Sequence, residues 1–257
     1  MQSKTFKLIV VGCMALVLAS CNTTHEGSGT QHHGPQIDEE LMNGEQSTFS
    51  IALSTEGCDE TSSFTSQFSI AEDSIKDLRI IQANSIPTHK TGRFPNQGNP
   101  NTIRPIEKTY RIDLTPEKSG RTTEAKGMSV GILLNGVEVD PFTNEFFVGS
   151  AGVNRGWNLT ALTSSINLGT DCNNAHVQPS GKYHYHGTPN AYLDELGADG
   201  TSMILVGYAA DGFPMYYKYG LNDDGELIEI ESGYRIKVGE RPGDGKSAPG
   251  GQCFFDI

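Results

Sequence analysis

The sequence predicts a mostly β protein, built as a single antiparallel sandwich or barrel-like domain with long loops and few short helices. Short segments of alternating apolar and polar residues recur along the chain and are bounded by Gly, Pro, Asn or Asp, as the strands of a half-buried sheet are. Asn135-Gly136 stands between two apolar runs, which is a strong signal for a two-residue hairpin turn. The 30 glycines and 12 prolines are typical of a loop-rich sheet protein.

The individual strands follow from this alternation and from the turn signals between them. Asp224-Gly225 and Ser232-Gly233 are further dipeptides that favour turns. Helical signals are confined to residues 160–165 and 191–196, each long enough for one or two turns. The predicted strands are 48–53, 78–83, 109–114, 129–134, 137–139, 183–186, 203–209, 215–219, 227–231 and 234–238.

The N-terminal segment, residues 1–20, has the pattern of a lipoprotein signal peptide. Two lysines precede an apolar run that is too short for a permanent membrane span. The run ends in Leu-Ala-Ser-Cys at 18–21, which is typical of a bacterial lipobox, so we expect cleavage before Cys21 and lipidation of that cysteine. An ordinary signal peptide followed by a cysteine is the alternative. Asn22 at the next position favours the outer membrane in a Gram-negative host, with the lipid as the expected membrane contact.

A flexible tether and one folded domain are expected after the leader. Residues 21–47 are rich in Gly, Ser, Thr and acidic side chains and have little to bury, which predicts a flexible tether. The domain is expected over residues 48–257, long enough for one sizeable core. The formal net charge of −12 argues against nucleic acid as a partner, because nucleic-acid binding relies on basic side chains that meet phosphates.

The most informative stretch is 171–187, which holds three of the seven histidines. Residues 183–186 read Tyr-His-Tyr-His after a Pro-Ser-Gly turn, so a strand there places His184 and His186 on one face and the two tyrosines on the other. If the chain folds back as a hairpin, His176 reaches the same face. Three imidazoles from two strands suit Zn²⁺ or a copper ion. The alternative is a half-buried strand on which Tyr and His alternate for packing alone.

Several stretches together resemble the YHYH domain family. Besides 183–186, the resemblance covers residues 86–101, 133–142 and 206–220, which occur in the family's order and span most of 80–255. It implies motif residues but no reaction, since the biochemical activity of the family is uncharacterised. Relatives often continue beyond the final Pro-Gly-Gly-Gln-Cys-Phe-Phe-Asp-Ile, so the resemblance implies that the domain is a short member or is truncated at its C-terminus.

Three further residues are candidates for the same site. The resembling segment of the family carries a histidine where this chain has His89, and we expect His89 to join the three others at a strand end; the alternative is a loop histidine bonded to backbone. Asp211 and Glu195 are candidate general bases. Asp211 lies in an Asp-Gly-Phe-Pro turn, where an aspartate commonly caps its own turn, and its other possible role is to orient a histidine.

Three cysteines remain if Cys13 is removed with the leader and Cys21 is lipidated. Export places them in an oxidising compartment, where one disulfide and one thiol are expected. Many relatives carry a further cysteine shortly after the YHYH run, where this chain has Ala191, so the resemblance implies that Cys172 has lost its usual partner. Pairing with Cys58 or Cys253, a free thiol and a metal ligand all stay open for Cys172.

Three functions fit these observations. The first is a lipid-anchored envelope protein that holds zinc or copper through its histidines. The second is a metal-dependent hydrolase or lyase with one open metal position. The third is a metal-free structural or binding domain. A serine hydrolase is disfavoured, because the chain has no Gly-x-Ser-x-Gly elbow.

Overall fold

The computed structural model describes residues 57–120, 129–141, 143, 145–149, 152–158, 161–162, 167–198 and 201–230. Several expectations lie outside the described residues: the leader, the lipidation of Cys21, the tether, Cys253, the predicted strands at 48–53 and 234–238, and all but two residues of the predicted helix at 160–165.

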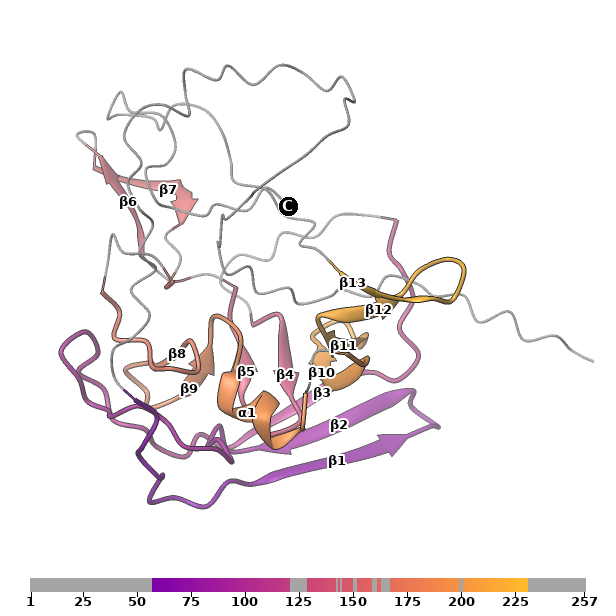
Figure 1. Cartoon of the computed structure of the whole chain (residues 1–257), viewed down its shortest axis with the longest axis horizontal. Coiled ribbons are helices and arrows are strands. Elements are labelled where there is room, and N and C mark those ends of the chain that lie inside the picture. The colour runs from indigo at the N-terminus through magenta and orange to yellow at the C-terminus, as the bar shows by residue number, and fades with distance from the viewer. Residues whose placement is uncertain are drawn as a thin grey trace, which may run out of the picture.

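The largest sheet has six strands in the order β11-β10-β4-β5-β9-β8 (Figure 1). Neighbouring strands are antiparallel except for β5 and β9, which run parallel. The turn between β4 and β5 is a three-residue loop over 134–136, not the predicted two-residue Asn-Gly turn: Gly136 N donates to the Leu133 carbonyl, and Gly136, with a φ of 81°, is left-handed whereas Asn135 is not. The strands are β4 (Gly131–Leu133), β5 (Glu138–Val139), β8 (Ala175–Val177), β9 (Tyr183–Tyr185), β10 (Ile204–Ala209) and β11 (Pro214–Tyr217).

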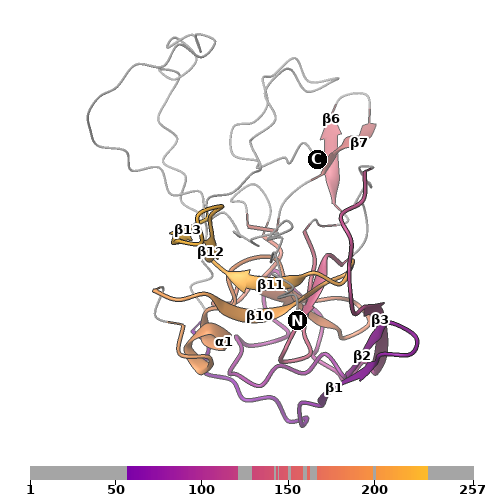
Figure 2. The ribbon, with the colours of Figure 1, turned by 90° about the vertical axis from the view of Figure 1, so that its right-hand side faces the viewer.

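A three-stranded antiparallel sheet, in the order β1-β2-β3, lies against the larger one (Figures 1 and 2). Two hairpins complete the β structure, and in both views the β6–β7 hairpin projects away from the two sheets. The remaining elements are β1 (Phe68–Asp73), β2 (Leu78–Ala83), β3 (Lys108–Asp113), β6 (Phe146–Gly149), β7 (Gly152–Asn158), β12 (Tyr219–Leu221), β13 (Leu227–Glu229) and the helix α1 (Asn190–Glu195).

The main core covers one face of the six-stranded sheet. Tyr183 and Tyr185 are fully buried there, and α1 adds Tyr192 and Leu193 to the same cluster. Phe94, from the long segment that precedes β3, packs against it as well. The other buried members are Leu133, Val137, Val139, Ala175, Val177, Val206, Ala209 and Met215.

The opposite face is covered over part of its width by the three-stranded sheet. Ile132 of β4 forms a second buried cluster with Ile81, Ala83 and Ile112 of β2 and β3. Tyr208 of β10 packs against this cluster as a partly buried residue. The remainder of this face, on β5, β9 and β8, carries polar side chains and is where the candidate site lies.

The predicted fold class is confirmed, with two refinements. The structure is mostly β, and α1 matches the predicted helical turn at 191–196. The parallel β5–β9 pair makes the large sheet mixed, and the described strands close no barrel. Among the described elements, β1, β6, β7 and β12 were not predicted, and β8 was anticipated only as the other half of a hairpin with residues 183–186. The solvent-exposed β1 and the three-residue β8 and β12 have too little apolar alternation to be recognised.

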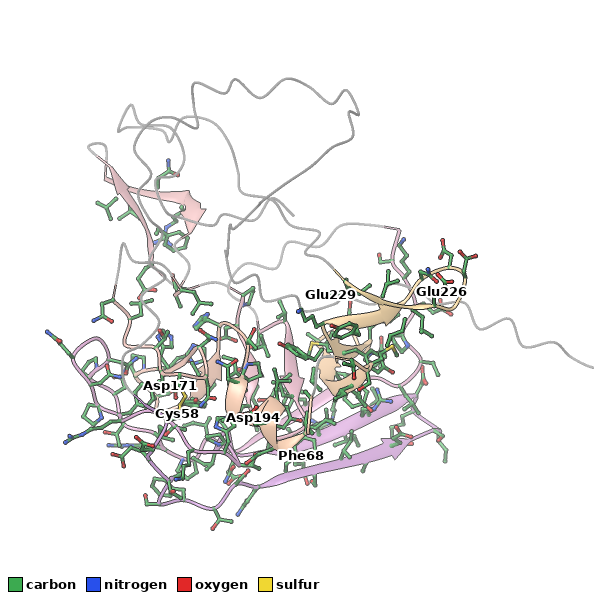
Figure 3. The ribbon with its side chains drawn as sticks, viewed as in Figure 1. Cys58, Phe68, Asp171, Asp194, Glu226 and Glu229 are labelled. Carbon is green, nitrogen blue, oxygen red and sulfur yellow. A yellow bond between two sulfur atoms is a disulfide. The ribbon has the colours of Figure 1, made fainter. Side chains whose placement is uncertain are left out.

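One disulfide closes the loop that leads into β8. Cys58 and Cys172 are paired across 114 residues of sequence, with 5.8 Å between their Cα atoms. Figure 3 shows Cys58 and its sulfur bond close to Asp171. This selects one of the alternatives that the sequence left open for Cys172. No helix within the described residues has the length and apolar character needed to cross a membrane.

Candidate metal centre

The candidate site is built on one row of residues that crosses the large sheet. The strand register pairs Tyr208 with Ile132, Ile132 with Glu138, Glu138 with His184, and His184 with His176. Residues paired across a sheet point to the same face. The row therefore changes from apolar side chains under the small sheet to imidazoles at the β8 edge.

The three histidines converge through their Nε2 atoms. His186 Nε2 lies 2.9 Å from His184 Nε2 and 3.1 Å from His176 Nε2, and the candidate ligand atoms all lie within 4.8 Å of one another. Two imidazoles on one zinc ion, with Zn–N bonds of about 2.0–2.1 Å and an angle between 90° and 109°, place their nitrogens about 2.9–3.4 Å apart. Both separations from His186 fall in this range.

Backbone carbonyls orient two of the three rings. His176 Nδ1 lies 3.1 Å from the Leu168 carbonyl oxygen, and His184 Nδ1 lies 3.3 Å from that of Lys182. A carbonyl oxygen accepts only, so each Nδ1 carries the proton and each Nε2 keeps its lone pair. A second partner at the far ring nitrogen is the usual way in which a metal-binding histidine is held in place.

His186 is held less firmly, because its one backbone partner, Asp140, has the smallest of the effects on its pKa. Its Nδ1 atom is buried and makes no well-formed hydrogen bond within the described part of the chain. Its Nε2 atom faces two acceptors, His176 and His184, and a neutral imidazole has one proton to give. One proton on His186 Nε2 cannot fully satisfy both acceptors, whereas a cation between the rings would accept the Nε2 lone pairs of all three histidines.

The environment keeps the cluster neutral. Burial lowers the pKa of His176, and it lowers the pKa of His184 and His186 to well below the usual value. Repulsion between neighbouring imidazoles adds to the effect at His184 and His186, because a second positive charge in the cluster is unfavourable. The neutral imidazole is also the form that binds metal ions.

The cluster opens into a cleft of about 870 Å³. All three histidines line it, together with residues of β3, β4, β5 and β10. A cleft of this size accommodates a small organic molecule. The site therefore has access to solvent and to a ligand, although His184 and His186 are themselves buried.

A buried charge network borders the histidines. Glu138 is fully buried and accepts hydrogen bonds from the ammonium groups of Lys108 and Lys182 and, at 2.6 Å, from the Tyr110 hydroxyl. Burial by itself would raise the pKa of Glu138, but these donors hold it at about 2, so the carboxylate is a permanent anion.

Asp140 is the acidic residue nearest to the cluster. Its Oδ2 atom lies 3.6 Å from His184 Nε2 and 3.4 Å from Lys182 Nζ, and its Oδ1 atom is 2.5 Å from the Ser129 hydroxyl. Asp140 was not predicted from the sequence as a site residue. The available signal was spacing: Glu138 and Asp140 are two apart at a predicted strand, so they share a face.

His89 does not join the cluster. It lies on the tyrosine side of β9, where its Nδ1 atom is 2.8 Å from the Lys90 carbonyl oxygen and its Nε2 atom is 2.5 Å from the Tyr185 hydroxyl. Asn135 Nδ2 donates to the same hydroxyl at 2.8 Å. The predicted convergence of four histidines is therefore wrong for His89. Strand alternation places Tyr185 and His184 on opposite faces of the sheet, and His89 packs on the face of Tyr185.

The two acidic residues predicted as bases also lie elsewhere. Asp211 is exposed in the β10–β11 turn, where its Oδ1 atom is 3.5 Å from the backbone nitrogen of Phe213, as the turn-capping alternative expects. Glu195 is exposed at the end of α1 and accepts a hydrogen bond from Thr88 at 2.6 Å. Neither lines the cleft that holds the three histidines.

Fold and site together define a mostly β domain with a histidine cluster in a cleft. The sequence model of the YHYH protein family matches residues 109–254, which is more than half of the 257 residues, and the chain therefore belongs to the YHYH protein family. The match begins within β3, so the segment with His89 precedes it. A search of curated proteins and a search of solved structures find no match.

Proposed function

We propose that this YHYH protein binds one Zn²⁺ or copper ion through the Nε2 atoms of His176, His184 and His186. The observation that carries the proposal is the convergence of the three Nε2 atoms, two of them 2.9 Å and 3.1 Å from the third. Neutral imidazoles suit both metals, and neither disulfide-bonded cysteine offers a thiolate to compete.

The first experiment is metal analysis of protein purified without a histidine tag. We expect close to one zinc or copper ion per chain after equilibration with the metal, and less than a tenth of that for His176→Ala. His176 is the least buried ligand, so its removal disturbs packing least. His32→Ala, in the predicted tether, is the matched control and should retain the metal. Equal metal contents in the wild type and the His176→Ala variant would refute the proposal.

A second function, metal-dependent hydrolysis, is favoured by the position of the cluster. Three histidines at the wall of a cleft leave a metal coordination position for water, whereas a structural site is closed by four protein ligands. A metal there would lower the pKa of bound water, and Asp140 lies on the same side to accept its hydrogen bond. Asp140→Asn should abolish hydrolysis of chromogenic esters or phosphates and leave the metal content unchanged; unaltered hydrolysis would exclude Asp140.

Anchoring in the cell envelope through lipidated Cys21 completes the proposal. It is supported by the Leu-Ala-Ser-Cys sequence at 18–21 and by the Cys58–Cys172 disulfide, which fits an oxidising compartment. Cys21→Ser should move the protein from the membrane fraction to the soluble periplasmic fraction of a Gram-negative host. A variant that stays with the membrane would contradict the anchor.

A further inference from the structure

The cleft beside the histidines has a balanced set of charges. Among the described residues that line it, three are cationic and three are anionic, and the three histidines are neutral. A divalent ion at the cluster would therefore leave the cleft with a net charge of about +2, since no acidic residue is left over to offset it. The charged residues are Lys108, Arg111 and Lys182, and Glu138, Asp140 and Glu145.

The acidic residues nearest the histidine cluster already form hydrogen bonds or ion pairs with other side chains. Glu138 is bonded by both lysines and by Tyr110, and Asp140 is within reach of Ser129 and Lys182. Lys108 is about half exposed, with a side-chain exposure of 49%, so its ammonium group can donate to a ligand in the cleft as well as to Glu138. With a divalent ion bound, the cleft is a cationic pocket inside an acidic protein, and it attracts anions locally.

The far end of the cleft is apolar. It is lined by Ile132, Ile112 and Tyr208, which belong to or border the second buried cluster. Ile132 and Tyr208 stand in the same row as His184, two and three strands away from it. With about 4.8 Å between strands, Tyr208 is roughly 14 Å from His184 along the row.

We propose that the metal-loaded cleft binds an organic oxyanion, a carboxylate or a phosphate ester with an apolar body. This inference rests on the proposed metal site. The oxyanion occupies the open position of the metal and accepts a hydrogen bond from Lys108 or Lys182, and the apolar body extends towards Ile132 and Tyr208. A bare inorganic anion would leave most of the 870 Å³ unfilled, so the apolar part is expected to add affinity.

The test uses the full-length protein loaded with Co²⁺, whose visible spectrum reports a change of ligand at the metal. The metal content is measured first, and a protein that binds neither Co²⁺ nor Zn²⁺ would refute the proposed metal site itself. We expect 1-naphthyl phosphate and 1-naphthoate to shift the spectrum saturably, at least about tenfold more tightly than inorganic phosphate, and 1-naphthol to leave it unchanged. The relative affinities of 1-naphthyl phosphate and 1-naphthoate show whether the cleft prefers a phosphate ester or a carboxylate.

Two variants localise the binding. Lys108→Met should weaken naphthyl phosphate binding about tenfold without changing the metal content, because a charge-assisted hydrogen bond is lost. Lys76→Met is the matched control, since Lys76 is exposed on the β1–β2 turn away from the cleft. Stoichiometric Co²⁺ with a spectrum that no anion alters would overturn the inference alone. Equal binding of naphthol, or inorganic phosphate as tight as naphthyl phosphate, would overturn it as well.

Discussion

Replacing His186 by leucine should make the metal-free protein more stable while abolishing metal binding. His186 is 7% exposed, its Nδ1 atom makes no well-formed hydrogen bond within the described residues, the Asp140 backbone affects its pKa only weakly, and its Nε2 atom faces two other imidazole nitrogens. A buried imidazole in this position contributes little to folding unless a cation is bound. Leucine has a similar volume and no polar atom to satisfy, so His186→Leu removes an unfavourable group from the apo protein.

The expected change follows from the unsatisfied ring nitrogen. One buried polar atom without a partner costs about 1–3 kcal/mol, and 1 kcal/mol corresponds to about 2–4 °C in Tm for a domain of roughly 200 residues. Allowing for imperfect packing of leucine, we expect the apo variant to melt about 2–6 °C above the apo wild type. Metal reverses the order, because free Zn²⁺ at 100 times its Kd stabilises the wild type by about 2.7 kcal/mol and the variant not at all.

The assay is thermal unfolding by circular dichroism, once with a chelator and once with excess Zn²⁺. The matched control is His89→Leu. Both ring nitrogens of His89 are hydrogen-bonded, to Lys90 and Tyr185, and the His89→Leu variant should therefore have a lower Tm than the wild type with chelator and with Zn²⁺. If His186→Leu destabilises the protein in chelator as His89→Leu does, the histidine cluster is a hydrogen-bonded part of the core and the reasoning is refuted.

Three further predictions concern pH, the disulfide and the tyrosine side of the strand. Burial holds the pKa of His184 well below 6.5, so below pH 6.5 the unfolded chain binds a proton that the folded chain does not. In the presence of chelator, Tm should therefore fall as the pH is lowered from about 6.5 to 5. A Tm that does not change over this range would contradict a buried neutral cluster. Reducing the Cys58–Cys172 disulfide, which spans 114 residues, should lower Tm by roughly 10–20 °C, because closing a loop of this length stabilises the fold by about 4–5 kcal/mol in the chain-entropy model. An unchanged Tm would show that the disulfide does not restrict the unfolded chain. Tyr185→Phe should cost about 2–4 kcal/mol in urea unfolding, since it leaves Asn135 Nδ2 and His89 Nε2 without their hydroxyl partner. Tyr192→Phe removes a long bond of 3.4 Å to the Val206 carbonyl and a backbone hydrogen bond with Leu134, so it should cost less, about 1 kcal/mol; equal losses would count against the network.

The sequence predicted the local geometry of the site because strand alternation is a local property. The faces of His184 and His186 and the reach of His176 across the turn follow from the Tyr-His-Tyr-His run and the Pro-Ser-Gly turn before it. The Asn135-Gly136 dipeptide predicted the position of the β4–β5 hairpin correctly, although its loop has three residues instead of two.

What the sequence could not predict depends on pairing between distant strands. The parallel β5–β9 pair places Glu138 beside His184, and no local pattern specifies that neighbour. The same pairing places Asp140 Oδ2 3.6 Å from His184 Nε2, whereas the predicted Asp211 does not line the cleft. His89 was expected at the cluster because it follows a strand end, yet the segment after β2 covers the opposite face of the large sheet.

The most direct test of the metal site is X-ray absorption spectroscopy of the Zn²⁺-loaded protein at the metal edge. We expect three imidazole nitrogens at about 2.0–2.1 Å, with the outer-shell scattering that whole imidazole rings produce, one further light atom and no sulfur. In the His176→Ala protein the imidazole signal should be lost together with the metal. A spectrum with one imidazole or none, or with sulfur at about 2.3 Å, would contradict a centre formed by His176, His184 and His186.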